Sequence, residues 1–216
     1  MERLPLFPLQ LVLFPGMLLP LRIFEERYKL MIGRCLEEQT SFGVVLIRSG
    51  EEVGGPVEPH DVGTTAGIVR FRRLEDGRMN LVVRGERRFR IDRLDRSEPY
   101  LMGAVTYLES EEIDAPEVEV EAQRAAALFG EQFRLVMAIT GQWVRHLNLP
   151  NDPDRLADFV AHQIEIPPAT KQELLETLSV PARLRRETEL LGDLIRKLTE
   201  RWEEERRKRF AGPALN

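Results

Sequence analysis

The sequence predicts an α+β fold in which a small β barrel with one helix is followed by an α-helical bundle. The first half contains short alternating or continuous apolar runs, which are typical of strands. The second half carries apolar residues three or four positions apart, which is the helical period. Between them, residues 109–121 contain acids without lysine or arginine, and Pro116 interrupts any regular element. We therefore expect a β domain over residues 1–112 and a helical domain over residues 117–209.

In the first half, the expected elements follow one another closely. Apolar residues at helical spacing predict one amphipathic helix over Glu25–Glu38, with Cys35 on its buried side. Gly77 can supply the positive φ of a tight turn at Glu75–Arg78 and so predicts a hairpin. Strands are expected over residues 42–47, 66–74, 79–83, 88–92 and 101–108. A sheet of about five or six strands is a common size and can curl into a small barrel.

The second half predicts consecutive helices. An apolar stripe predicts a long first helix and consists of Phe129, Phe133, Val136, Thr140, Trp143, Val144 and Leu147. Asp152 and Pro153 suit the N-cap and first position of a second helix. Thr170 has capping-box spacing for a third helix, and Pro181 lies at the start of a fourth.

Charge and cysteine content limit the classes of function. The formal net charge of −5 argues against broad attachment to nucleic acid or anionic lipid, which needs a dominant positive field. One cysteine cannot form an internal disulfide, so a cytoplasmic location is expected. Four prolines interrupt the apolar start, Leu4–Leu21, and exclude a helical signal sequence there. No apolar run is long enough to cross a membrane as a helix.

Motifs that support catalysis do not occur in the sequence. It has no phosphate-binding loop of the form GxxxxGK[ST] and no GxSxG serine motif. The three histidines, His60, His146 and His162, stand singly, and Cys35 has no neighbouring ligand. We therefore expect no catalytic residues, no metal site and no cofactor.

The order of several short motifs resembles the Lon N-terminal domain family. The opening signature is Leu4-Pro5-Leu6-Phe7-Pro8-Leu9, and Val12-Leu13-Phe14-Pro15-Gly16 follows it. Later motifs are Val62-Gly63-Thr64, Asp76-Gly77, Gly85 with Arg88 and Ile91, Pro99-Tyr100-Leu101, and Pro181-Ala182-Arg183-Leu184. Each motif alone is a weak signal, but their shared order from about Leu4 to Leu198 is specific.

This resemblance implies a fold and a function. The fold would be a PUA-like β barrel with a helical bundle. The function would be recognition of unfolded or flexible polypeptides, with a separate ATP-dependent protease as a possible partner. We expect neither the ATPase nor the Ser-Lys peptidase of complete Lon proteases within these 216 residues.

A polypeptide-binding surface must expose apolar side chains, and Phe14–Phe24 is a candidate segment. Within it we select Met17, Leu18, Leu19 and Arg22. Met17 and Leu18 fit a core position equally well, and we expect Phe14 and Phe24 in the core. A groove between barrel and bundle is a second candidate site.

Residues 70–96 contain ten arginines against five acids. Alternation predicts Phe89 and Ile91 on one face of a strand, with Arg88 and Arg90 on the other. These arginines could be the solvent side of a sheet, paired with the acids at 109–121. Alternatively, a face made by Arg84, Arg87, Arg88 and Arg90 could bind an RNA backbone or an acidic peptide. The first interpretation is favoured because no aromatic residues are interleaved on the arginine side.

Overall fold

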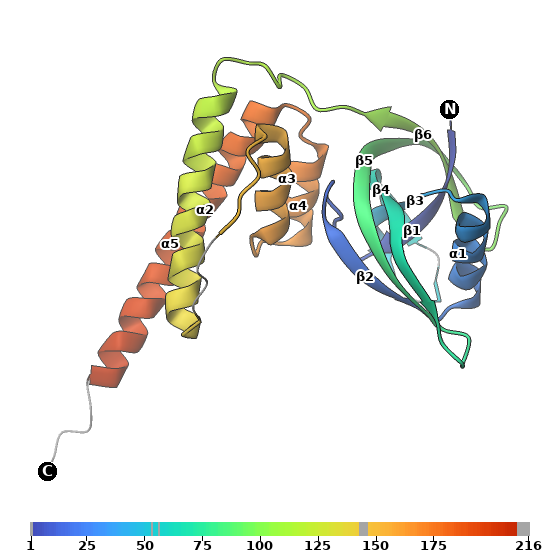
Figure 1. The fold of residues 1–216 in the computed structure, drawn as a ribbon, viewed down its shortest axis with the longest axis horizontal. Helices are drawn as coiled ribbons and strands as arrows, with labels where there is room; N and C mark the ends of the chain where they lie inside the picture. Colours follow the sequence, from blue (N-terminus) through green and yellow to red (C-terminus); the bar gives the residue numbers. More distant parts are fainter. Residues whose placement is uncertain (1, 53, 56, 143–146, 211–216) are drawn as a thin grey trace, which may run out of the picture. The chain divides into compact units, whose positions relative to one another are not determined.

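The structure is a computed structural model that describes residues 2–52, 54–55, 57–142 and 147–210. The chain folds as two units (Figure 1). The strand unit comprises the described residues up to Glu111 together with Ala161–Leu178. The helical unit comprises Glu112–Val160 and the described residues from Ser179 onward. The division expected from the sequence differs, because it assigned residues 161–178 to the helical domain.

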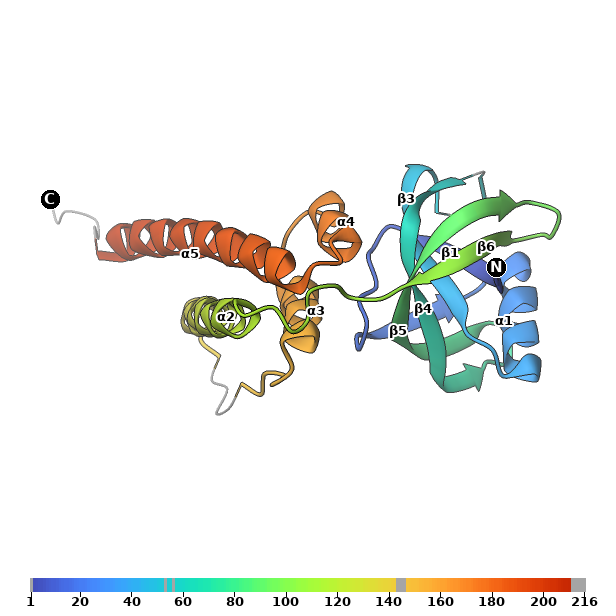
Figure 2. The same ribbon diagram turned by 90° about the horizontal axis from the view of Figure 1, so that it is seen from above.

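Within the described residues, the strand unit contains one six-stranded sheet, whose pairings close in a ring. The strands are β1 (Glu2–Leu9), β2 (Leu18–Ile23), β3 (Phe42–Gly50), β4 (Val57–Arg73), β5 (Met79–Asp95) and β6 (Leu101–Leu108). The ring runs β1-β3-β4-β5-β6 and returns to β1, and the β1–β3 pair is parallel. Seen from above, these strands curve round one another (Figure 2). The predicted α+β fold is confirmed.

Strand β2 lies outside this ring and pairs only with β5 among the described strands. It covers residues 79–84 of β5, whereas β6 covers residues 88–95. Pro20 stands in the middle of β2, opposite Val82. Proline has no N–H to donate, so it is tolerated where the donor would face away from the ladder. The other edge of β2 therefore pairs with no described strand and lacks a donor at Pro20.

Gly85 lies where β5 changes partner from β2 to β6. Its N–H donates to the Met17 carbonyl (2.9 Å), and its own carbonyl accepts the Gly16 N–H (2.8 Å). A Cβ at Gly85 would lie 2.2 Å from the Phe14 carbonyl oxygen. Glycine is required here because the turn that leads into β2 crosses directly over the β5 backbone.

The core of the strand unit forms between the inner faces of the strands and helix α1 (Glu26–Glu38). On β5, Met79, Leu81 and Val83 are buried, as alternation requires. The buried face of α1 comprises Tyr28, Met31, Ile32 and Cys35. Burial raises the pKa of the Cys35 thiol, which keeps it protonated and unreactive. The predicted helix and its buried cysteine are confirmed.

Helix α4 (Pro168–Glu176) belongs to the strand unit. The Gln172 side-chain amide donates to the Val62 carbonyl of β4 (2.9 Å), and the Arg88 Nε donates to the Leu175 carbonyl (3.1 Å). The prediction that Arg88 faces solvent is wrong, because its side chain is buried, with 4% exposed. A buried guanidinium needs acceptors, and the end of α4 supplies one.

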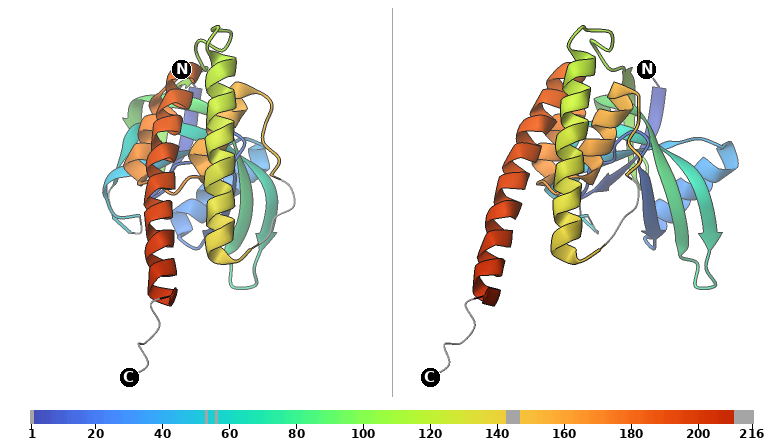
Figure 3. Two further views of the ribbon diagram at one scale, coloured as in Figure 1. Left: turned by 90° about the vertical axis from the view of Figure 1, so that its left-hand side faces the viewer. Right: turned by 60° about the vertical axis from the view of Figure 1, so that its left-hand side comes forward.

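In the helical unit, α2 (Val118–Thr140) and α5 (Val180–Phe210) lie side by side and run in the same direction (Figure 3). The phenyl ring of Phe129 meets Phe159 of α3 (Pro153–Gln163) edge to face, 5.7 Å between centroids. Arg183, fully buried at the start of α5, pairs with Asp154 and Asp158 of α3. The unit therefore encloses a charged cluster within its apolar core.

Two predicted helix boundaries are corrected. The long helix ends at Thr140, because Gly141 adopts φ 66° and its N–H donates to the Met137 carbonyl, which is a left-handed C-terminal cap. Leu147 lies beyond that helix, and Trp143 and Val144 fall outside the described residues. Helix α4 begins at Pro168 and not at Thr170, because proline suits the first helical turn. The Asp152 cap of α3 is confirmed, since its Oδ1 accepts the Arg155 N–H (2.9 Å).

We expect Gly85→Ala to destabilise the protein by about 1–3 kcal/mol or more, because the added methyl group collides with backbone at Phe14. Gly33→Ala is the matched control. Its Cβ would meet no atom within 4 Å on α1, so it should gain about 0.5–1 kcal/mol. Urea unfolding of both variants measures the difference. An unchanged midpoint for Gly85→Ala would contradict the close approach described above.

Candidate functional site

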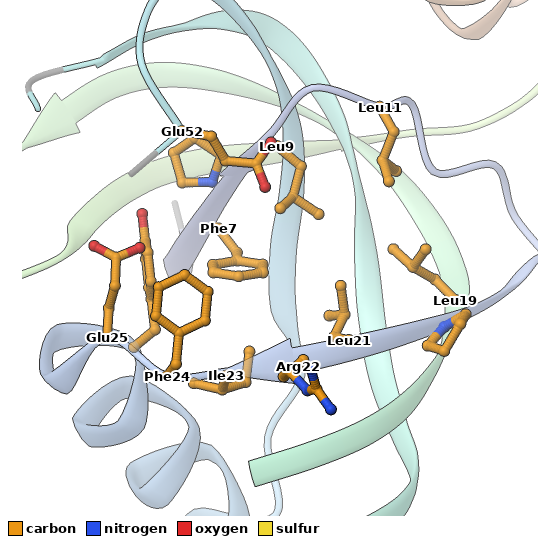
Figure 4. A pocket seen from close by; sticks show the side chains of 13 residues that line it. Phe7, Leu9, Leu11, Leu19, Leu21, Arg22, Ile23, Phe24, Glu25 and Glu52 are labelled. Carbon is orange, nitrogen blue, oxygen red and sulfur yellow. The ribbon is translucent and has the colours of Figure 1, made fainter. Parts of the chain in front are cut away.

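A pocket of about 270 Å³ opens in the strand unit between the end of β1 and strand β2 (Figure 4). Its lining comes from β1 (Phe7, Pro8, Leu9), the segment after it (Leu11), β2 (Leu19, Pro20, Leu21, Arg22, Ile23), the entry to α1 (Phe24, Glu25), α1 (Tyr28) and the loop after β3 (Glu52). Strand β6 pairs with β1 only as far as Leu6, so on that side no described strand pairs with Phe7–Leu9, which line the pocket. We call it the β1–β2 pocket.

Aromatic rings form the floor of the β1–β2 pocket. Phe7 packs edge to face against Tyr28 (4.4 Å between centroids) and against Phe42 (6.0 Å). The Arg27 guanidinium lies over the Tyr28 ring at 4.5 Å. Burial raises the pKa of the Tyr28 phenol, and the nearby Arg27 charge acts in the opposite direction. These contacts fix the rings and give the floor a rigid apolar surface.

The rim of the β1–β2 pocket combines one exposed aromatic ring with charged groups. Phe24 is 50% exposed, although it borders a largely apolar cavity. Glu25 forms an ion pair with Arg27 (2.9 Å), and Glu52 accepts the Gln10 N–H (2.9 Å). Both rim carboxylates are therefore engaged within the protein. The Arg22 side chain is exposed and forms no ion pair with any described residue.

This arrangement suits non-covalent capture of apolar groups. A cavity of about 150 Å³ is enough to bind benzene, so the pocket can admit a large aliphatic or aromatic side chain. Among the described residues that line it, none is a serine, cysteine, histidine or lysine. The lining therefore offers hydrophobic contact and a few polar groups at the rim, without a nucleophile paired to a base.

The structure separates the four residues selected from sequence. Leu19 and Arg22 line the β1–β2 pocket. Met17 is half-buried and packs against the core, and Leu18 is 51% exposed on the other face of β2. Leu18 and Met17 do not line the pocket, so only Leu19 and Arg22 of the four belong to one site.

Sequence reasoning missed most of the pocket, since its lining is spread from Phe7 to Glu52. Phe24 was expected in the core and is half-exposed, which is a correction. It follows the last residue of β2, and the chain then turns into α1, so no neighbouring strand covers its ring. The signal available in the sequence was the apolar, proline-rich opening, which supplies Phe7, Leu9 and Leu11.

The four arginines selected as an alternative nucleic-acid face do not share one environment. Arg84 is exposed, whereas Arg88 is buried. The Arg87 side chain pairs with Glu109 (2.7 Å) and stacks over the Tyr107 ring at 4.2 Å. The Nε of Arg90 lies 3.4 Å from Asp92 Oδ1. Three of the four therefore have protein partners, so the selected set is not a free basic surface.

The structure also bears on metal binding and on membrane spanning. Within residues 2–52, 54–55, 57–142 and 147–210, no three His, Cys, Asp or Glu side chains come together as a metal site would require. The Nδ1 of His60 lies 3.7 Å from Glu176 Oε1, and His146 falls outside the described range. Burial and the neighbouring Lys171 lower the pKa of His162. None of the described helices has the length and apolarity to span a bilayer.

Comparison with protein families decides the family of this chain. The model of the ATP-dependent protease La (LON) substrate-binding domain matches residues 3–193. The chain belongs to this family. The Lon-type resemblance expected from the short motifs is confirmed over nearly the whole chain. In this Lon substrate-binding domain, two motif residues have structural roles, since Gly85 permits the turn into β2 and Arg88 binds the end of α4.

Curated relatives of the Lon domain are Lon proteases. The Lon protease of Paraburkholderia phytofirmans is 34% identical over 187 residues, which are 85% of this chain and 23% of that protein. The Lon protease of Escherichia coli is 32% identical over 187 residues, covering 84% of this chain and 23% of that protein. The chain thus spans less than a quarter of the length of these relatives.

Solved structures of Lon domains share the fold. The crystal structure of a Lon N-terminal domain protein from Xanthomonas campestris has a TM-score of 0.65 and 28% sequence identity, and covers 86% of this chain and 96% of that one. The N-terminal domain of the Mycobacterium avium complex Lon protease also has a TM-score of 0.65, at 24% identity, covering 90% of this chain and 98% of that one. At that identity the second match shows the fold alone.

Adjacent leucines test the assignment of the two β2 faces. Leu19 is buried, with 6% exposed, so Leu19→Ala should cost about 2–5 kcal/mol through the cavity it leaves. Leu18→Ala removes the same atoms from an exposed position and should change stability by less than about 0.5 kcal/mol. Thermal unfolding of both variants measures the contrast. Equal destabilisation would show that the faces are assigned wrongly.

Proposed function

We propose that this Lon substrate-binding domain captures unfolded or flexible polypeptides by taking their apolar side chains into the β1–β2 pocket. One observation carries the proposal. Phe24, an exposed aromatic ring, stands at the rim of a preformed apolar cavity on the strand unit. Membership of a substrate-binding family supports the same function. Exposed apolar groups beside a cavity are typical of interaction sites.

The pocket can accept many sequences because its contacts would be made through side chains. Pro8 and Pro20 border it from β1 and β2 and provide no N–H groups. An incoming chain could not pair continuously with either strand edge, so backbone hydrogen bonding would contribute little. Capture would then depend on the apolar surface that an unfolded chain exposes and a folded protein hides.

Membership of the Lon family also supports inferences about catalysis, location and a protease partner. We infer that it has no catalytic activity of its own and that it operates in the cytoplasm. The relatives that share this domain are proteases. A captured polypeptide could therefore be presented to an ATP-dependent protease, either within one chain or as a separate partner.

Fluorescence anisotropy with a labelled unfolded polypeptide tests the proposal. We expect binding to the unfolded chain that persists at moderate salt, and none to the folded counterpart of the same protein. Phe24→Ala should weaken this binding by about 1–2 kcal/mol, or roughly 5- to 30-fold in Kd, without loss of stability. The reason is that its ring contributes contact area at the rim and little to the core.

Leu30→Ala is the matched control for Phe24→Ala. Leu30 is 42% exposed on α1 and does not line the pocket, so its removal should change Kd by less than about twofold. Equal effects of the two substitutions would place the binding surface elsewhere. Binding confined to RNA, or equal binding to folded and unfolded chains, would overturn the proposed function.

A further inference from the structure

The register of β4, β5 and β2 brings four arginines onto one face of the sheet. Arg72 of β4 and Arg22 of β2 both lie opposite Asn80 of β5. Two residues further along β5, Val82 lies opposite Arg70 of β4. Two residues beyond Val82, Arg84 lies opposite Leu18 of β2. Directly opposed residues in paired strands project on the same side. The face defined by Arg22, Arg70, Arg72 and Arg84 is called here the arginine face.

Burial confirms that the arginine face points away from the core. Residues 79, 81 and 83 of β5 are buried, whereas Asn80 and Arg84 are exposed. Strand β2 alternates in the same way, since Leu19 and Ile23 are buried and Leu18 and Arg22 are exposed. A β-bulge between Ile68 and Arg70 places Arg70 and Arg72 in phase with this outer side.

The four guanidinium groups are not neutralised within the protein. Elsewhere in the strand unit, exposed arginines pair with acids, as Arg3 does with Asp95, Arg48 with Asp61 and Arg96 with Glu58. Among the described residues, by contrast, no acid forms an ion pair with any member of the arginine face. Glu86 borders this face beside Gly67, and its carboxylate accepts the Ser41 hydroxyl (2.8 Å). Four positive charges thus concentrate locally on a chain whose net charge is −5.

Apolar side chains occupy the centre of the arginine face. Leu18 is half-exposed, Pro20 is exposed and Val82 is partly buried, and all three lie in the rows that hold the arginines. No aromatic residue occurs in these three rows. Single-stranded nucleic acids are bound by basic grooves with aromatic rings on which bases stack. An apolar centre with a cationic border instead matches a polypeptide that carries both apolar and acidic side chains.

We propose that the arginine face is a second binding site, which takes acidic residues that flank an apolar segment of a polypeptide. The proposal rests on the proposed function at one point, because Arg22 belongs to the arginine face and also lines the β1–β2 pocket. A chain whose apolar residue occupies the pocket can therefore place neighbouring carboxylates on β2 and β5. Exposed arginines bind carboxylates by charge-assisted hydrogen bonds, and salt weakens this attraction.

Three labelled peptides of equal length test this selectivity. They share the same apolar residues and differ only in flanking residues, which are acidic, neutral or basic. At about 50 mM salt we expect the acidic peptide to bind roughly tenfold more tightly than the neutral one, and the basic peptide most weakly. At about 200 mM salt the difference between the acidic and neutral peptides should shrink.

Charge-reversal variants test which arginines cause the preference for the acidic peptide. Arg84→Glu and Arg72→Glu should each remove most of the preference for the acidic peptide and leave the affinity for the neutral peptide unchanged. Arg93→Glu is the matched control, since Arg93 is exposed on the same strand, β5, but outside the arginine face. Arg84→Gln and Arg72→Gln, with thermal unfolding of all variants, distinguish loss of charge from loss of fold.

Each outcome has one interpretation. Equal affinity for acidic and neutral peptides would overturn the arginine face and leave the β1–β2 pocket intact. Failure of the neutral peptide to bind would overturn the proposed function instead. An RNA oligomer that binds more tightly than the acidic peptide, and loses affinity in Arg84→Glu, would overturn the choice of a polypeptide as the ligand.

Discussion

Strand β5 pairs with three other strands, and on one of its sides it exchanges β2 for β6 near Gly85. This exchange is possible because Gly85 lets the turn at Phe14 lie against the β5 backbone. The ring of strands then closes through β6, and β2 is left with a free edge. The β1–β2 pocket lies beside that edge, and the arginine face lies on the outer side of the same strands. Both sites thus depend on one backbone contact.

The close approach at Gly85 also explains why a short strand can serve two surfaces. Pairing with β5 holds β2 rigidly, and alternation sends Leu19 and Ile23 inward while Leu18 and Arg22 remain outside. The inward residues contribute the burial that stabilises the strand. The outward residues of β2 contribute little to stability, so core packing does not restrict which side chains they carry.

Local patterns in the sequence were sufficient to predict most elements. Alternation and turn chemistry identified the hairpin of β4 and β5, and helical spacing identified α1 with Cys35 buried. The end of α2 was missed because apolar residues continue at helical spacing beyond Gly141, whose backbone conformation ends the helix. Residues 161–178 were expected in the helical domain but group with the strand unit, since their contact with β4 through Gln172 leaves no periodic signal in the sequence.

The candidate sites were harder to predict, because they depend on strand pairing. Arg84, Arg87, Arg88 and Arg90 are close in sequence, but α4 buries Arg88 and Glu109 pairs with Arg87. Arg22, the pair Arg70 and Arg72, and Arg84 lie on three different strands, and only the strand register and the β-bulge in β4 bring them together. Phe24 has the hydrophobicity of a core residue, and its exposure depends on what lies opposite it. Pairing register is not encoded by any single segment.

The proline in the middle of β2 also affects how the outer edge of this strand can meet other polypeptide chains. A free strand edge can recruit other chains into a growing sheet, and unfolded polypeptides are the chains most ready to join. Pro20 withholds a donor at the centre of that edge, and Arg22 adds a charge beside it. Under the proposed function, the domain would hold unfolded chains without becoming a template for their aggregation.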